Sequence, residues 1–510
     1  MTERIETDVA IVGAGLGGLS AARHLQEAGH RVVVLEGHSK PGGYAHFFRK
    51  EDFRFEVALH ALDGLGEGGW AKPMFETLGI LDRVEFNRLD PFYTARFPDF
   101  ELEVPTDIDR YLDNLAAIFP EELDGAKQMF AAIKRIGHDM ARYASDRSRG
   151  NRVPQHEMPA VYPDMAMAFA SSWDTWISQY LSSPEAKAAV TALWGYLGLP
   201  PSRLSAGQFA LLLLSYHTAG AWYPTGGSGT MTWAIAEVIE ERGGEIRFRD
   251  EVRSIEPHAD GATVTTRKGV VVDAKAVVSN ASPTATASML PAGLVDDGFV
   301  AEVTGETPSV SSLVVHLGVD RDLAAEGWDH HEYIVATGYD IEAEYEALMD
   351  GRFGETGMII SNYTVIDPDN APEGSTVLAL TALAPWDHAN VWGTGGNLEN
   401  YRVKQSYIDV KEAAGNILID RAAELIPGLR ESIVTQHIGT PLTNVRYVRQ
   451  PAGSLYGREQ TVMNMMNRRR PTTPIDNLFL TGAWVGGGGM TTAVGSGKQA
   501  ARACARYLDR

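Results

Sequence analysis

The residues with the clearest capacity for chemistry are glycines near the N-terminus, followed by an acid. The apolar stretch 7–12 predicts a short buried strand, and 31–35 predicts a second strand that is closed by Glu36. Between them, Gly13, Gly15 and Gly18 form a G-x-G-x-x-G pattern that opens a predicted helix, and Gly17 is a further candidate for cofactor binding. Glycine lets backbone approach a pyrophosphate, the helix N-terminus attracts it, and an acid at this distance accepts hydrogen bonds from ribose hydroxyls. The pattern predicts a bound dinucleotide.

A second glycine pair follows the acid. Glu36, Lys40, Gly42 and Gly43 belong to an E-x-x-x-x-x-G-G pattern, which indicates backbone lying against the pyrophosphate again, with Lys40 adding positive charge. This extended pattern resembles the large flavoprotein family that contains amine oxidases, phytoene desaturases and Rab GDP-dissociation inhibitors. The resemblance implies FAD as the cofactor, bound extended, with its adenine half in the N-terminal fold.

A central segment resembles the FAD domain of the phytoene desaturase group. Tyr223-Pro224 precedes a glycine-rich turn and a predicted helix at 230–242, and short strands are then predicted at 245–249, 252–256, 262–266, 270–272 and 276–278. The resemblance implies that the turn with Gly226 and Gly227 lies near the isoalloxazine, and that the backbone of Val252 holds the adenine. An ordinary β-meander is the alternative interpretation.

The C-terminal segment predicts a strand at 477–480 that delivers glycines to the start of a helix. Such a helix N-terminus suits an anion, here the N1–C2=O edge of a reduced flavin. The segment is similar to that of carotenoid desaturases and retinol saturases, and 439–457 is similar to retinol saturases and carotenoid isomerases. Amine oxidases usually carry Gly-Glu where this chain has Gly482-Ala483. The cofactor residues implied here are Gly482, Ala483, Gly489, Met490 and Thr491.

Few residues can be singled out for catalysis, because a flavin carries the reaction and the protein mainly orients the substrate. His60 is a candidate acid–base group, and Tyr223, Arg446 and Tyr456 are candidates for the substrate border. For each of them, a structural hydrogen bond or ordinary packing is the alternative. No metal site is predicted, and the polar run 329–332 is expected to be a solvated loop. No second dinucleotide motif indicates a separate NAD(P) site.

The architecture expected is an α/β fold with a Rossmann-like FAD-binding domain and a discontinuous α+β substrate domain. The first comprises 1–65, 222–285 and 437–510, and the second comprises 66–221 and 286–436. Within the second, helices are predicted at 116–144, 165–181 and 401–425, and strands at 311–317, 358–362 and 376–382. The apolar stretch 206–214 is either a core helix or the lining of a substrate tunnel or membrane contact.

Composition limits the partners and the location. The 510 residues carry a formal net charge of −21, which argues against nucleic acid as a partner. The single cysteine, Cys504, excludes an internal disulfide, and a buried position is expected for it. No signal peptide or long apolar run is evident, so a cytoplasmic protein is expected, with peripheral membrane contact left open.

The functional expectation is an FAD-dependent oxidoreductase that acts on C–C or C=C bonds of a small apolar substrate, polyene or isoprenoid. Desaturation, saturation and isomerisation all remain open. Its electron acceptor is unknown, with oxygen or a quinone as options. The alternatives are an amine or amino-acid oxidase of the same fold and, more remotely, a non-catalytic prenyl-protein binder.

Overall fold

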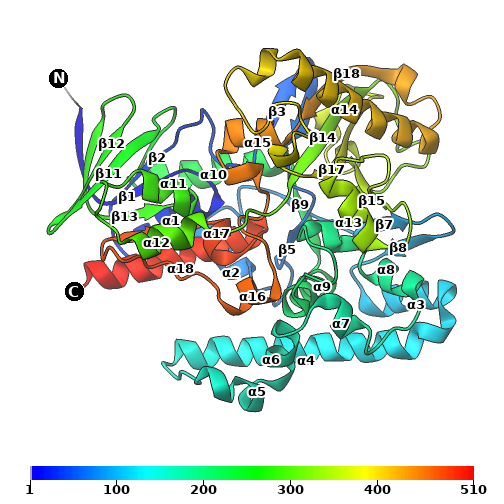
Figure 1. Ribbon diagram of the computed structural model, residues 1–510, viewed down its shortest axis with the longest axis horizontal. Helices are drawn as coiled ribbons and strands as arrows, with labels where there is room; N and C mark the ends of the chain where they lie inside the picture. Colours follow the sequence, from blue (N-terminus) through cyan, green and yellow to red (C-terminus); the bar gives the residue numbers. More distant parts are fainter. Residues whose placement is uncertain (1–2) are drawn as a thin grey trace.

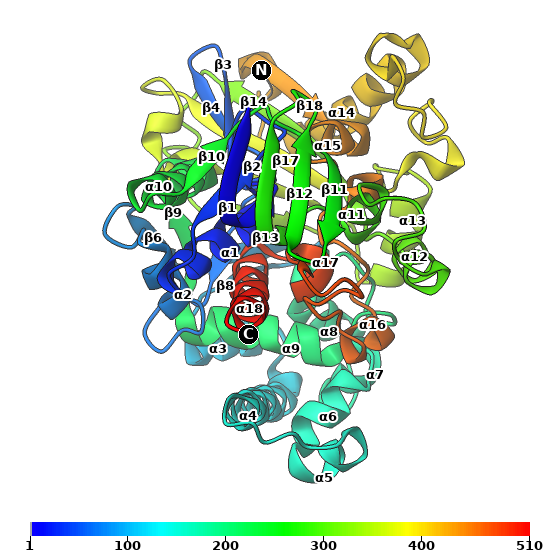
Figure 2. The ribbon, with the colours of Figure 1, turned by 90° about the vertical axis from the view of Figure 1, so that its left-hand side faces the viewer.

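The computed structural model describes residues 3–510, and its largest N-terminal feature is a mostly parallel sheet (Figure 1). The sheet gathers strands that are far apart in the sequence, and Figure 2 shows several of them side by side. In spatial order these are β10 (Glu245–Arg247), β2 (Val32–Leu35), β1 (Arg4–Val12), β13 (Val271–Ser279), β12 (Gly261–Thr266) and β11 (Val252–His258), with β19 (Leu478–Leu480) beside β13. The strands β12 and β11 are the antiparallel members.

The sheet forms because its central strands are apolar on both faces. All four residues of β2 are buried, and β1 pairs in parallel with both β2 and β13. Two helices from opposite ends of the sequence, α1 (Leu16–Glu27) and α18 (Met490–Leu508), pack against each other. A Cβ at Gly497 would lie 2.4 Å from the carbonyl oxygen of Gly17, so this approach requires glycine. The predicted strands 270–272 and 276–278 are one continuous strand, β13.

A second large sheet contains strands from both long insertions. Its order is β18 (Ile433–Gly439), β14 (Ser311–Val319), β17 (Thr376–Ala384), β16 (Met358–Asn362), β15 (Glu332–Val335), β7 (Tyr93–Arg96) and β8 (Glu101–Val104). The strand β15 pairs in parallel with β7, which joins the two insertions in one sheet. Every residue of β14 is buried, and α14 (Gln405–Leu425) packs on this sheet.

Helices of the first insertion form a layer at the bottom of Figure 1. The predicted helix 116–144 is two helices, α3 (Ile108–Ile118) and α4 (Leu123–Ser148). They are separated because Phe119, which precedes Pro120, is held outside helical geometry. The prediction 165–181 also splits, into α6 (Pro163–Phe169) and α7 (Trp173–Ile177), because Ser172 caps a new helix. The apolar stretch 206–214 lies in α9 (Ala206–Ala219).

Smaller elements connect these layers. A three-stranded sheet contains β5 (Leu62–Asp63), β9 (Ala221–Pro224) and β6 (Phe86–Leu89), and a hairpin contains β3 (Phe47–Lys50) and β4 (Phe53–Glu56). The other α-helices are α2 (Lys72–Leu78), α5 (Met158–Val161), α8 (Pro184–Val190), α10 (Gly227–Glu241), α11 (Pro283–Ser288), α12 (Asp297–Thr304), α13 (Ile341–Met349), α15 (Pro441–Val448), α16 (Val462–Met466) and α17 (Ala483–Gly486). Within residues 3–510, no helix has the length and apolar character needed to cross a membrane. Cys504 is fully buried in α18.

Candidate functional site

A cavity of about 1160 Å³ lies where the two large sheets and the helical layer meet. This volume is above the roughly 300–1,000 Å³ typical of small-molecule pockets. One part of its wall is glycine backbone from three separate segments of the chain. Another part is apolar and comes from α4, α9 and the strands β15 to β17.

The glycine part of the wall unites residues from both ends of the chain. A Cβ at Gly17 would lie 2.5 Å from Oδ1 of Asn280 and 2.9 Å from the backbone of Gly482. Gly482 and Gly489 have φ angles of +93° and +103°, which other residues rarely adopt. The sequence-predicted cofactor residues that line the cavity are Gly15, Gly17, Gly42, Gly43, Gly482, Ala483, Gly489, Met490 and Thr491.

Two helices begin at this glycine wall without a side-chain cap. Gly15 is the N-cap of α1 and Gly489 is the N-cap of α18, and neither helix has an acidic residue in its first turn. Uncapped N–H groups and the positive end of each helix dipole favour an anion. Glycine backbone also allows a flat ring or a pyrophosphate to lie close. These residues therefore fit the flavin dinucleotide FAD.

Other predicted cofactor residues lie outside the cavity wall. Gly13 forms the turn between β1 and α1 with a φ angle of +90°, and a Cβ at Gly18 would lie 2.0 Å from the carbonyl oxygen of Gly13. Glu36 accepts hydrogen bonds from the backbone N–H groups of Ala14 (2.7 Å) and His38 (2.6 Å). Its side chain therefore connects the end of β2 to the glycine turn between β1 and α1.

Lys40 and Val252 also lie outside the cavity wall. Lys40 donates a hydrogen bond from its ammonium to the carbonyl oxygen of Phe47 at 2.7 Å. Val252 begins β11, and the pairing of this strand with β12 shifts register between Val252 and Ser254. The regular pairing of β11 with β12 therefore begins only after Val252.

The structure places Gly226 and Gly227 against protein carboxylates rather than at the cavity. The backbone N–H of Gly226 donates to Oδ2 of Asp367 at 2.8 Å, and the N–H of Ser228 donates to Oε2 of Glu56 at 2.8 Å. The start of α10 thus already holds two acidic side chains in the position that an anionic ligand would take. Burial raises the pKa of Glu56, although hydrogen bonds from Ser228 act in the opposite direction.

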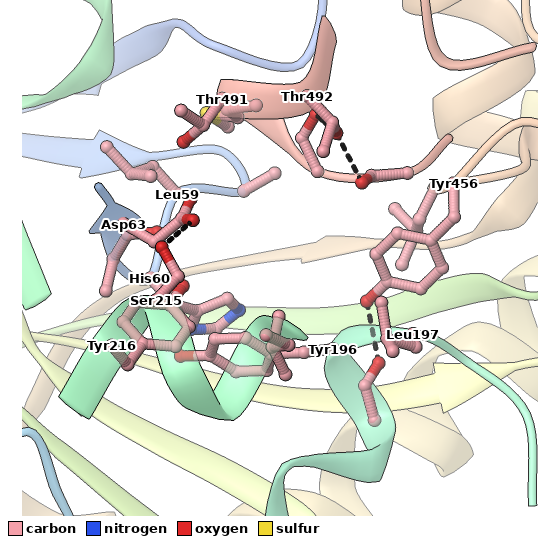
Figure 3. Close-up of a pocket in the computed structure, with 18 of the residues that line it drawn as sticks. Leu59, His60, Asp63, Tyr196, Leu197, Ser215, Tyr216, Tyr456, Thr491 and Thr492 are labelled. Atoms are coloured by element: carbon pink, nitrogen blue, oxygen red, sulfur yellow. Dashed lines mark hydrogen bonds between the residues drawn. The ribbon is translucent and has the colours of Figure 1, made fainter. Parts of the chain in front are cut away.

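Of the four candidate catalytic residues, the structure brings His60 and Tyr456 to the cavity. Tyr456 donates its hydroxyl to the carbonyl oxygen of Gly195 at 2.7 Å (Figure 3). Tyr223 is fully buried behind the wall, where its hydroxyl donates to Oε2 of Glu56 at 3.2 Å. Arg446 is exposed on α15 and lies outside the main cavity, with its guanidinium over the ring of Tyr447. Tyr223 and Arg446 are therefore not placed to touch a ligand in this cavity.

His60 is held by a buried carboxylate. Its Nδ1 lies 2.8 Å from Oε2 of Glu332 and 3.2 Å from the hydroxyl of Ser361. The hydroxyl of Tyr196 donates to the other oxygen of Glu332 at 2.6 Å. Figure 3 shows His60, Tyr196 and Tyr216 together, across the cavity from Thr491 and Thr492 of α18.

The expectation of a solvated loop at 329–332 is wrong for its last two residues. His331 and Glu332 are 3% and 1% exposed, because Glu332 begins β15 and both side chains turn into the molecule. Sequence reasoning missed this carboxylate, although the apolar run at 333–335 that follows it was a strand signal. Among the described residues, no cluster of acidic, histidine or cysteine side chains is arranged to hold a metal ion.

A second acidic group lines the cavity beside α9. Oδ2 of Asp63 accepts hydrogen bonds from the hydroxyl of Ser215 at 2.6 Å and from the indole of Trp70 at 3.1 Å. Farther along the wall, a guanidinium nitrogen of Arg468 donates to Oε1 of Gln208 at 2.7 Å. Asp63 and Arg468 are thus each held by a defined protein partner at the cavity wall.

Comparison with known proteins identifies the family of the chain. The model of a family described as flavin containing amine oxidoreductase matches residues 16–505. The all-trans-retinol 13,14-reductase of Danio rerio is 24% identical over 94% of this chain and 82% of its own length. The chloroplastic prolycopene isomerase of Daucus carota is 24% identical over 94% of this chain and 76% of its own length.

Solved structures share the fold. Cyclohexylamine oxidase from Brevibacterium oxydans superposes with a TM-score of 0.63 at 18% identity, covering 99% of this chain and 100% of its own. An oxidoreductase from Methanosarcina mazei has a TM-score of 0.61 at 18% identity, covering 96% of this chain and 98% of its own. The expected α/β fold with a Rossmann-like FAD-binding part is confirmed. The chain belongs to the flavin containing amine oxidoreductase family and is an FAD-dependent oxidoreductase.

Proposed function

We propose that this enzyme acts on carbon–carbon double bonds of a long apolar substrate, a polyene or an isoprenoid. The observation that carries the proposal is the continuity between the glycine wall and the apolar part of the same cavity. An apolar substrate gains about 25 cal/mol for each Å² that it buries there. The apolar lining includes Met140, Leu211, Leu212, Leu214, Ile334 and Ile359.

The named relatives support this substrate class. Retinol and prolycopene, the compounds in the names of the reductase and the isomerase, are both polyenes. The chain has Gly482-Ala483 where amine oxidases usually carry Gly-Glu. Asp63 and Glu56, two of the four acids in the cavity wall, already accept hydrogen bonds from Ser215, Trp70 and Ser228. The apolar part of the wall offers an ammonium group no compensation for its lost hydration.

The protein's part in the reaction is to hold the cofactor, orient the substrate and shield the substrate from water. The first turns of α1 and α18 would hold the pyrophosphate and the anionic edge of the flavin through their backbone N–H groups. FAD, when bound, supplies the hydride chemistry at its N5 atom. The apolar wall from α4 and α9 keeps water from the substrate and aligns its chain, which lowers the barrier through positioning. Electrons are exchanged with a small acceptor or donor of the oxygen or quinone class.

Anaerobic spectroscopy of the purified holoprotein tests the proposal. All-trans-retinol and lycopene isomers are mixed with the oxidised protein and, separately, with the dithionite-reduced protein. At least one of three results is expected. The flavin bands of the oxidised protein are bleached, the bands of the reduced protein return, or the isomer composition of the polyene changes. Reaction with a panel of primary amines and none with polyenes would overturn the proposal in favour of an amine oxidase. A colourless protein that cannot be reconstituted with FAD would point instead to a binding protein.

A further inference from the structure

We infer that His60 and Glu332 form a proton-transfer dyad, in which Nε2 of His60 exchanges a proton with the substrate carbon next to the one that exchanges hydride with the flavin. The inference rests on the proposed function and extends it, because it assigns the second half of the chemistry to residues of this chain. It depends on three observations. These are the contacts that hold His60, the charges of the groups around it, and the lack of a hydrogen-bond partner at its Nε2 atom.

The ring and the backbone of His60 are each held. Nδ1 of the ring is engaged by Oε2 of Glu332 at 2.8 Å, and the backbone carbonyl oxygen of His60 lies 2.9 Å from Nε2 of the His331 ring. Glu332 is held in turn by Tyr196. Among the described residues, Nε2 of His60 has no hydrogen-bond partner, and His60 lines the cavity with 17% of its side chain exposed. The nitrogen left free is therefore the one available to a ligand in the cavity.

Glu332 is the charged partner of this dyad. Its burial acts to raise the pKa, but the nearby His60 and the hydrogen bonds from His60 and Tyr196 outweigh that effect and hold the pKa of Glu332 below its ordinary value. The carboxylate of Glu332 is 1% exposed, and Nδ1 of His60 at 2.8 Å is one of its partners inside the molecule. Because Glu332 engages Nδ1, it fixes the orientation of the His60 ring and leaves Nε2 for proton exchange.

Burial favours the neutral form of several other titratable groups around the dyad. Burial lowers the pKa of His331 and raises the pKa of Tyr196, Tyr216 and Tyr363. The pKa values of Tyr93 and Tyr456 are also raised, by burial and by the charge of Glu332. Four acids line the cavity: Glu56, Asp63 and Glu344 accept hydrogen bonds from the protein, and Glu67 is exposed. We assign proton exchange beside Glu332 to His60 because Nε2 of its ring has no hydrogen-bond partner among the described residues.

The reducing step balances with these groups. Reduced FAD, when bound, would supply the hydride for one carbon of the double bond, and Nε2 of His60 would donate the proton to the other carbon, where the π electron pair forms the second C–H bond. The double bond gains two electrons, the imidazolium becomes neutral imidazole, and a quinol-class donor restores the electrons. In the reverse direction, Nε2 takes the proton as hydride leaves the substrate, and a quinone or oxygen accepts the electrons. Isomerisation without net reduction needs no such proton exchange.

The test compares His60→Gln and Glu332→Gln with wild type as FAD-loaded holoproteins. The rate of flavin reoxidation by all-trans-retinol or a lycopene isomer is followed after anaerobic reduction with dithionite. We expect His60→Gln to lower this rate by about 10²–10⁴-fold, the usual contribution of a positioned acid–base group, with FAD content and polyene affinity retained. His156→Gln, on the exposed surface, is the matched control.

A change in the charge of Glu332 tests whether this residue acts through its charge or only through packing. We expect Glu332→Gln to move the pH–rate profile to lower pH, because the imidazolium loses a neighbouring negative charge. Tyr196→Phe removes a hydrogen bond to the same carboxylate but leaves its charge, so its profile stays nearer to that of wild type. A second readout, which needs no substrate, is the ¹⁵N NMR titration of His60 in the holoprotein, whose midpoint should fall in Glu332→Gln.

The outcomes distinguish the two ideas. A wild-type protein that reacts with no polyene overturns the proposed function, and the NMR titration then decides the dyad alone. A titration of His60 that Glu332→Gln leaves unmoved overturns the dyad. If wild type reduces a polyene and His60→Gln does so at the same rate, the proposed function stands and the dyad is overturned.

Discussion

Glu56 accepts hydrogen bonds from both the backbone N–H (2.8 Å) and the hydroxyl (2.6 Å) of Ser228, across more than a third of the chain. This contact fixes the start of α10 to the end of β4, at a point where Glu56 also reaches the cavity wall. The buried side chain of Glu56 therefore connects helix α10 to the wall of the ligand cavity.

Replacing Glu56 should destabilise the fold. In Glu56→Ala, the donors on Ser228 and the hydroxyl of Tyr223 lose their buried acceptor. Since an unsatisfied buried donor costs about 1–3 kcal/mol, we expect the free energy of unfolding to fall by roughly 3 kcal/mol. Urea denaturation measures it. Glu240→Ala, at an exposed position on α10, the helix that contains Ser228, is the control. An equal loss of unfolding free energy in both variants would contradict the stabilising role of the contact between Glu56 and Ser228.

A methyl group on the glycine wall should expel the cofactor. In Gly17→Ala, the new Cβ would collide with the backbone of Gly482 at 2.9 Å and with Asn280 at 2.5 Å, so the two N-terminal and C-terminal halves of the site must separate. We expect FAD affinity to fall by at least about tenfold, which corresponds to about 1.4 kcal/mol. The flavin-to-protein absorbance ratio after gel filtration checks it. Gly354→Ala, where no heavy atom lies within 4 Å of the new Cβ, should keep its flavin.

Residues placed away from the cavity should be dispensable for turnover. Tyr223→Phe removes one hydrogen bond to Glu56, so we expect a loss of about 1 kcal/mol in stability with kcat and KM unchanged. Arg446→Gln, at an exposed position, should leave both stability and turnover unchanged. Steady-state kinetics with all-trans-retinol or a lycopene isomer decide the matter. A large loss of kcat in either variant would show that these residues reach the substrate during turnover.

Glu344 should make stability depend on pH. Burial raises the pKa of Glu344 from 4.5 to about 7, against the hydrogen bond from the N–H of Gly357 and the charge of Arg421. The folded protein therefore binds this proton more tightly than the unfolded chain, so the contribution is full below about pH 4.5 and is lost as pH rises through about 7. That difference is worth about 3 kcal/mol.

The measurement is urea denaturation at about pH 5 and about pH 8. We expect wild type to lose stability relative to Glu344→Gln between these values, because the amide of glutamine does not ionise. Glu346→Gln, at an exposed position on the same helix α13, should follow wild type. Parallel curves for wild type and Glu344→Gln would contradict the shifted pKa.

The N-terminal unit was predictable because its signals are local. The strand β1, the glycine turn, the helix α1 and the strand β2 follow one another within 35 residues, and each is encoded by its own apolar or glycine pattern. The cavity wall at Gly482 and Gly489 was predictable for the same reason, since strand, glycines and helix are contiguous there.

The positions that sequence reasoning missed depend on distant partners. Gly226 and Gly227 have the pattern of a ligand-binding turn, but Asp367 and Glu56, far away in the sequence, occupy that helix start. Glu332 lies in a polar run that reads as a loop, and only its contacts with His60 and Tyr196 make it part of the site. No local pattern reports which side chain will be buried against another more than a hundred residues away.

The packing of α1 against α18 sets the order of events in biosynthesis. Gly17, in α1, lies close to Gly482, which precedes α17, and Gly497 of α18 also closely approaches Gly17. A nascent chain that has released its first hundred residues from the ribosome has the nucleotide motif but not the site. FAD loading therefore has to follow synthesis of α18, and ribosome-bound chains that stop before residue 482 should neither retain the cofactor nor be protected by it.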